Sequence, residues 1–227
     1  MKRSQFYLYL LLILIVPGCN IIGPKIGFKK SDIGVKFSSS YNSDFDSKID
    51  IDGYYFLDEP YETAAFALYK DGTYLPLYFN LKWIKKNINR STNKLDSVIW
   101  INKERKPSFG GGIYKIEGDT LYIHSFYKFY SLPWSYIWEY SIEKYIIEDA
   151  NTLRLVGGVI MDNIRSNIRR YEANSIYRFV KASPLPSPFE AEVKTKKWMW
   201  ENKDDWKAYM IELNKYLDRK VAKDTVR

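Results

Sequence analysis

The chain has 227 residues, of which 46% are hydrophobic, 17% aromatic and 27% charged, and its formal net charge is +8. A single Cys excludes a disulfide scaffold. One Cys and one His together are too few for a zinc site built from these ligands. The 20 Tyr, 12 Phe and 7 Trp argue against a disordered chain. The only long apolar run lies at the N-terminus, which excludes a multi-span membrane protein. These numbers leave one globular, aromatic-rich and basic domain.

Residues 1–18 have the layout of an export signal. Lys2 and Arg3 precede an apolar stretch at residues 6–16, which is short for a membrane span. The stretch ends in Val16-Pro17-Gly18-Cys19, which resembles the lipobox of bacterial lipoproteins. In such proteins the Cys receives a diacylglyceryl thioether and the signal is cleaved in front of it. An ordinary signal with a chance Cys, or a buried free thiol, is the alternative.

This resemblance implies that Cys19 is a lipid anchor and that the protein lives in the bacterial cell envelope, with the outer membrane as the expected location. Several acyl chains would hold it there, since each buried CH₂ contributes about 0.8 kcal/mol. Removal of residues 1–18 would take Lys2 and Arg3 with it and lower the net charge to +6. Residues 19–51 are then the lipidated Cys and a tether.

Residues 52–183 are predicted to form the folded domain, because short apolar and aromatic runs alternate with turn signals. Asp71-Gly72 and Glu117-Gly118-Asp119 are typical of tight hairpins. A charged insert is expected at residues 162–172. The spacing, with no helical pattern between the runs, predicts an antiparallel barrel or sandwich. The predicted strands are residues 53–57, 63–69, 73–79, 97–102, 113–116, 120–126, 134–142, 145–147, 153–156 and 176–180.

Residues 184–227 are predicted to be a separate C-terminal region. Three prolines end the sheet, and the basic and aromatic run Lys196-Lys197-Trp198-Met199-Trp200 follows. An amphipathic helix comes next, with Asn202 or Asp204 as its N-cap. We expect its apolar stripe to pack on the outside of the sheet or to cover an open edge. The stripe consists of Trp206, Tyr209, Met210, Leu213, Tyr216, Leu217 and Val221.

Four short motifs between residues 52 and 181 resemble a lipocalin-like (calycin) domain of the kind found in small Bacteroidetes envelope lipoproteins. The resemblance implies a mainly β fold, an antiparallel up-and-down barrel of about eight to ten strands, here followed by the C-terminal amphipathic helix. In lipocalins a Trp stands where this chain has Tyr55, and Arg178 is the candidate for the Arg that packs over it. The motifs are Gly53-Tyr54-Tyr55, Lys70-Asp71-Gly72-Thr73-Tyr74, Gly118-Asp119-Thr120-Leu121-Tyr122-Ile123 and Tyr177-Arg178-Phe179.

No catalytic residue, metal site or cofactor is predicted. Asp50-Ile51-Asp52-Gly53 imitates a calcium loop, but Lys48 stands where the first acidic ligand belongs. His124 lacks a supporting Ser or Cys motif, so a structural role is expected. Glu139 and Glu143 are expected to face solvent. A non-enzymatic protein is therefore favoured, with a carboxylate-dependent hydrolase as the alternative.

Aromatic rings are the main candidate binding groups. They could line a cavity for a small apolar or amphipathic ligand, or stack on sugar rings of a glycan. The alternative is a barrel whose interior these rings fill. The candidates are Tyr55, Trp100, Tyr136, Trp138 and Tyr140.

The basic and aromatic C-terminal run offers a second candidate surface. Lys196, Lys197, Trp198 and Trp200 could contact the membrane or an envelope protein, or their rings could simply cover the barrel. Nucleic acid is not an expected partner of a lipid-anchored envelope protein. Two hypotheses follow: a lipid-anchored barrel that binds a small ligand, or an accessory protein with a solid barrel that contacts an envelope partner through its C-terminal segment.

Overall fold

The computed structural model describes part of the chain. The described residues are 25–26, 33–38, 48–58, 64–78, 88–89, 94–95, 110–132, 135–162, 167–181 and 185–225. The predicted signal at residues 1–18, the predicted anchor Cys19, Trp100 and the strand predicted at residues 97–102 lie outside them.

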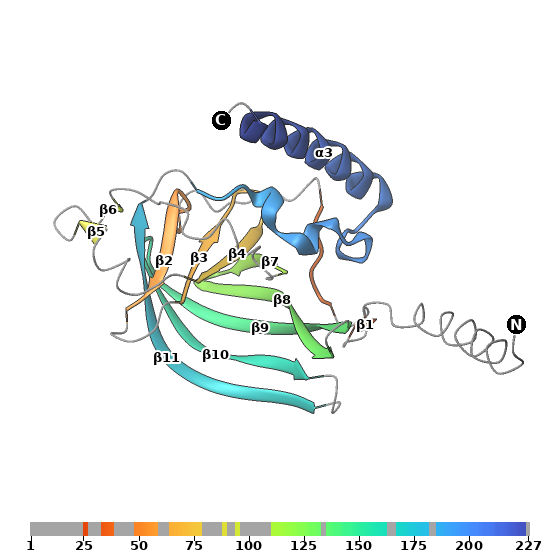
Figure 1. Cartoon of the computed structure of the whole chain (residues 1–227). Helices are drawn as coiled ribbons and strands as arrows, with labels where there is room; N and C mark the ends of the chain where they lie inside the picture. The colour runs from red at the N-terminus through yellow and green to blue at the C-terminus, as the bar shows by residue number, and fades with distance from the viewer. Residues whose placement is uncertain are drawn as a thin grey trace, which may run out of the picture.

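Eight of the described strands form a closed antiparallel barrel, which confirms the predicted fold (Figure 1). Each of the eight pairs with the next barrel strand along the chain, with β4 followed by β7, and β11 closes the ring on β2 through the pairs Tyr177–Leu57 to Lys181–Gly53. The strands are β2 (Gly53–Leu57), β3 (Ala64–Leu68), β4 (Thr73–Tyr78), β7 (Gly112–Glu117), β8 (Thr120–Leu132), β9 (Ser135–Asp149), β10 (Thr152–Asp162) and β11 (Asn167–Lys181).

Three short strands add to the edges of the barrel. β1 (Lys25–Ile26) pairs in parallel with Ile137 and Trp138 of β9. β5 (Ile88–Asn89) pairs with β6 (Lys94–Leu95), which meets β11 at Lys181. Among the described residues, β1 is therefore the most N-terminal segment that is tied to the barrel.

Both predicted hairpin turns are present. Between β3 and β4, Gly72 has a φ of 77°, and the Asp71 carboxylate accepts a hydrogen bond of 3.0 Å from the backbone N–H of Thr73. Between β7 and β8, Gly118 has a φ of 59°. Glycine suits both positions because it adopts positive φ without a steric cost.

The deeper half of the barrel interior is filled by aromatic rings. The centroid of the Phe66 ring lies 5.3–5.7 Å from those of four other rings, which belong to Tyr55, Tyr74, Tyr145 and Tyr177. Ring pairs at such distances contribute about 0.5–1.5 kcal/mol each beyond their buried area. The interior is closed here by side chains from the strands themselves.

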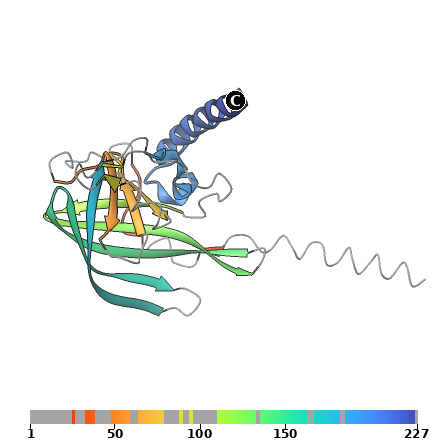
Figure 2. The ribbon, with the colours of Figure 1, turned by 60° about the vertical axis from the view of Figure 1, so that its left-hand side comes forward.

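The four strands β8 to β11 are much longer than the others and extend beyond this packed half (Figures 1 and 2). A β-bulge between Leu155 and Gly157 shifts the register of β10 against both neighbours, as bulges do where a strand bends. The strand end expected at Val156 is therefore wrong. β10 continues to Asp162, and β11 occupies most of the expected charged insert.

The C-terminal region crosses the outer face of the barrel as three 3₁₀ turns and a helix, which are η4 (Pro188–Glu190), η5 (Glu192–Thr195), η6 (Lys197–Met199) and α3 (Lys203–Thr225). Asn202 caps α3 as predicted, because its side-chain oxygen accepts hydrogen bonds from the backbone N–H groups of Asp204 and Asp205. Tyr209 and Leu213 are the buried residues of the stripe on α3. Among the described residues, no helix has the length and apolar character needed to cross a membrane.

Candidate functional site at the polar end of the barrel

Glu143 lies on the interior side of the barrel. Its neighbour at i+2 on β9, Tyr145, belongs to the interior aromatic cluster, and its partner across the β8–β9 ladder is the buried Ile123. Alternate residues of a strand share a face, so all three point inward. The expectation that Glu143 faces solvent is therefore wrong, although it does lie opposite the Trp138 face as predicted.

Two tyrosine hydroxyls hold the Glu143 carboxylate. The Tyr145 hydroxyl donates to Oε2 at 2.8 Å from the same strand. The Tyr171 hydroxyl donates from β11, across the intervening β10. Gly158 makes this reach possible, because a Cβ built there would lie 2.7 Å from the Tyr171 hydroxyl and 2.5 Å from the carbonyl oxygen of Ile142.

The pKa of Glu143 reflects its position inside the barrel. Burial raises the pKa of Glu143 above its ordinary value, while the hydrogen bonds from Tyr145 and Tyr171 act in the opposite direction by stabilising the carboxylate. A carboxylate can accept about four hydrogen bonds, so Glu143 has acceptor positions beyond those that the two tyrosines use. The site can therefore receive a hydrogen-bond donor or a cation.

The interior surface around Glu143 is polar and partly open. The hydroxyls of Ser125 and Ser141 lie 2.8 Å apart, directly opposite each other on β8 and β9. Ser125, Glu143 and Tyr171 are each partly exposed, whereas Tyr145, one step deeper, is 1% exposed. We call Ser125, Ser141, Glu143 and Tyr171 the polar end of the barrel.

The aromatic residues predicted to line one cavity lie in two different places. Tyr55 belongs to the interior cluster, and its hydroxyl donates to the carbonyl oxygen of Ala150 at 2.9 Å. Trp138 and Tyr140 belong to a second cluster on the outer face. Tyr136 lies on β9 opposite Tyr130, and Trp100 lies outside the described residues.

The second cluster forms because the C-terminal region covers the outer face of β7 to β9. Trp198 makes edge-to-face contacts with Phe126 and Trp138, with ring centroids 5.6 and 6.2 Å apart. Lys196 lies 5.6 Å from the centroid of the Trp138 ring and pairs with Glu192. The rings of this segment therefore cover the barrel, which was the alternative to a contact with the membrane or an envelope protein.

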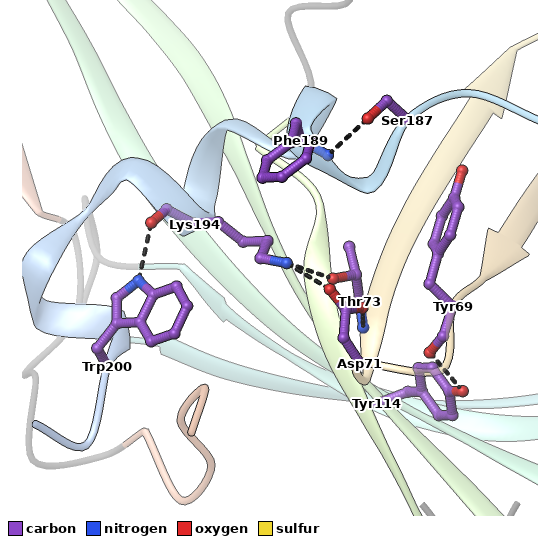
Figure 3. Close-up of polar contacts among 8 residues, drawn as sticks. All are labelled: Tyr69, Asp71, Thr73, Tyr114, Ser187, Phe189, Lys194 and Trp200. Atoms are coloured by element: carbon purple, nitrogen blue, oxygen red, sulfur yellow. Dashed lines mark hydrogen bonds and ion pairs between the residues drawn. The ribbon is translucent and has the colours of Figure 1, made fainter. Parts of the chain in front are cut away.

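One ion pair, between the buried Lys194 and the partly exposed Asp71, fastens this cover (Figure 3). The Lys194 ammonium donates to the Asp71 carboxylate at 2.6 Å and to the Thr73 hydroxyl at 3.1 Å, in the β3–β4 hairpin. The same ammonium lies 5.3 Å from the centroid of the Phe37 ring and 4.9 Å from that of Tyr209. Burial alone would raise the pKa of Asp71, but Lys194 and Thr73 hold it below its usual range.

Two further residues complete the cover. The Trp200 indole N–H donates to the carbonyl oxygen of Lys194 at 2.8 Å. Phe37 forms a parallel bridge with Trp200, so the segment at residues 33–38 is bound to the C-terminal region. Lys197 is exposed.

Arg178 does not pack over Tyr55. Its register partner is Phe56, so it points outward, where it pairs with Asp58 at 2.6 Å. The expected lipocalin-type contact is therefore replaced by a surface ion pair. Such pairs contribute little to stability, about 0–1 kcal/mol.

Within the described residues, no group of three His, Cys, Asp or Glu side chains could hold a metal ion. Glu139 lies four residues from Glu143 on one strand, which places their Cα atoms about 13 Å apart. Paired glycosidase carboxylates lie about 5–9.5 Å apart. The spacing does not favour a pair formed by these two residues.

Sequence reasoning missed the roles of Glu143, Tyr171 and Lys194. One signal was available for the first two, because consecutive glycines in the middle of an apolar run are typical of a bulge or of a close approach by another group. No comparable signal marks Lys194, which becomes special only because the C-terminal region folds back onto the β3–β4 hairpin.

The described strands and the polar end define an up-and-down antiparallel β-barrel with a covered outer face. Comparisons of the chain with protein-family models, with curated proteins and with solved structures found no match. A barrel of this kind supports many activities, so function has to be argued from the site.

Proposed function

We propose that this protein is a lipid-anchored, non-enzymatic protein of the bacterial cell envelope that binds a small amphipathic ligand at the polar end of its barrel. The observation that carries the proposal is the interior carboxylate of Glu143, held by Tyr145 and Tyr171 where the packed interior gives way to partly exposed polar residues. The lipobox-like end of the signal, at Cys19, supports the anchor.

The site favours a particular kind of ligand. The rings around Phe66 fill the deeper interior, so an apolar chain has little room there. A ligand with a donor or cationic head would meet Glu143, and its apolar part would lie along the interior face of β10. Ile160 lies on this face, since its register partner on β9 is Ser141.

Ligand retention tests the proposal. The purified protein is incubated with an envelope lipid extract, and bound molecules are identified by mass spectrometry. Wild type should retain an amphipathic molecule, and Glu143→Gln should retain at least tenfold less. Glu172→Gln is the matched control, because Glu172 is exposed and adjoins Tyr171 on the same strand. Equal retention by Glu143→Gln, or none by wild type, contradicts the proposal.

The anchor is tested separately. Metabolic labelling with an alkynyl fatty acid should mark the wild-type chain and leave the Cys19→Ala variant unlabelled. Labelling of both chains to the same extent would show that Cys19 is not the attachment point.

A second candidate function is an accessory protein that binds an envelope partner through α3. It is supported by the ring-filled interior and by large apolar side chains on the helix surface, with Ile211 57% and Leu217 46% exposed. Substituting both by Ser leaves the covered face of α3 intact. Loss of a co-purifying protein in this double variant, with ligand retention unchanged, would favour this candidate.

A further inference from the structure

The N-terminal strand and the far end of the β10–β11 hairpin lie along one edge of β9. The last β10 residue paired with β9 is Met161, which faces Tyr140, and its partner on β11 is Ile168. Two residues further along the same edge of β9, Trp138 pairs with Ile26 of β1. β1 therefore continues the edge at the point where β10 ends.

This register places the predicted anchor near the hairpin. Cys19 precedes Lys25 by six residues, and six residues of extended chain reach about 20 Å at most. An acylated Cys19 must lie at a bilayer surface, so the edge of β9 lies within that distance of the bilayer. The β10–β11 end then faces the membrane, while α3 lies on the opposite side of the barrel (Figures 1 and 2).

The side chains at this end suit an anionic lipid surface. Ile168 is 65% exposed, and it is followed by Arg169 and Arg170, which are also exposed. Alternation along β11 directs Ile168 and Arg170 to one face of the hairpin and Arg169 to the other. Arg169 is the register partner of the interior residue Ile160, so the face of Ile168 carries Arg170. An apolar side chain next to a guanidinium group fits the boundary between acyl chains and anionic headgroups.

We propose that the β10–β11 end docks on a bilayer containing anionic phospholipid, with Ile168 at the interface and Arg170 on the headgroups. The proposal rests on the lipid anchor of the proposed function. It also orients the proposed binding site, because the polar end then opens toward the lipid from which an amphipathic ligand would come.

A lipid-quenching experiment tests this orientation. The lipidated full chain carrying Ile168→Cys is labelled with an environment-sensitive fluorophore and reconstituted on the outside of vesicles of phosphatidylethanolamine and phosphatidylglycerol. Acylation blocks the thiol of Cys19, so only the new Cys reacts. Asp119→Cys is the matched control, since Asp119 lies in the β7–β8 turn and its side chain is 84% exposed.

Brominated lipids should quench the probe at position 168 at least twofold and leave the probe at position 119 nearly unchanged. Adding Arg170→Ser, or replacing phosphatidylglycerol by phosphatidylcholine, should reduce the quenching at 168. Absence of quenching at 168 in protein that floats with the vesicles overturns the docking and leaves the anchor standing. Equal quenching at both positions also overturns it. Wild-type protein that is not acylated and does not float overturns the anchor and the orientation together.

Discussion

The carboxylate of Glu143 and the hydroxyl of Tyr171 meet inside the barrel although their strands are not neighbours. β10 runs between them and presents Gly158, which has no side chain to stand in the way. A polar contact across an intervening strand requires such a gap. The contact therefore depends on three strands, through Glu143 of β9, Gly158 of β10 and Tyr171 of β11. Each of these residues can be tested by substitution.

We expect Gly158→Ala to separate Tyr171 from Glu143. The new Cβ would lie 2.5 Å from the backbone oxygen of Ile142, so β9 and β10 must move apart. Overpacking of this kind costs about 1–3 kcal/mol. Urea denaturation measures the loss, and Gly34→Ala is the control because a Cβ at Gly34 meets nothing within 4 Å. Equal stabilities of the two variants would contradict the close approach.

The pH dependence of stability should reveal the raised pKa of Glu143. A raised folded-state pKa means that the contribution of this group is fully present below its unfolded pKa of about 4.3 and declines as the pH rises through the folded pKa. Glu143→Gln removes the decline. Relative to wild type, the variant should therefore gain stability as the pH rises above about 4.3. A difference that stays constant over this range would show that the carboxyl is not desolvated.

The contribution of His124 to the pH dependence of stability should have the opposite sign. It is buried on the outer face with Nδ1 2.6 Å from the Tyr140 hydroxyl, and burial, followed by the charge of Lys115, lowers its pKa to about 4. Its contribution is therefore lost as the pH falls from about 6.5 to 4, by about 3 kcal/mol in total. His124→Gln should lack this loss. The chain has one His, so no other imidazole contributes to the comparison.

Replacing Lys194 by Met should loosen the cover over the outer face. The stem of the side chain is kept, but the hydrogen bonds to Asp71 and Thr73 are lost, which costs about 2 kcal/mol. Limited proteolysis should then cut the C-terminal region faster. Lys215→Met is the control, because Lys215 pairs with Glu212 on the exposed side of α3 and should cost less than about 0.5 kcal/mol. Similar cutting rates in both variants would show that Lys194 does not fasten the cover.

The sequence predicts the barrel and the helix because both have local signals. Alternating runs separated by Asp71-Gly72 and Gly118-Asp119 define antiparallel neighbours, and Asn202 begins α3. Closure of the ring on β2 was expected only from the family resemblance, since the pairing of Tyr177 with Leu57 has no local signal.

The candidate site was harder to predict, because alternation separates two faces of a strand without showing which one lies inside. On β9 the more aromatic face, with Trp138 and Tyr140, is the outer one, and only the folding back of the C-terminal region buries it. Glu143, on the less aromatic face, therefore looked like a surface residue. Its role depends on Gly158 and Tyr171, which come from strands that no local pattern pairs with it.

The ion pair of Arg178 and Asp58 joins residues 120 positions apart, at the seam where the barrel closes. A chain synthesised from its N-terminus presents β2 long before β11, so the ring stays open while most of the chain is made. Contacts between residues so distant in sequence also form slowly, because a long loop must close before they do. During this interval the rings around Phe66 are exposed, so the stage before the ring closes is the one at which this protein most needs protection from aggregation.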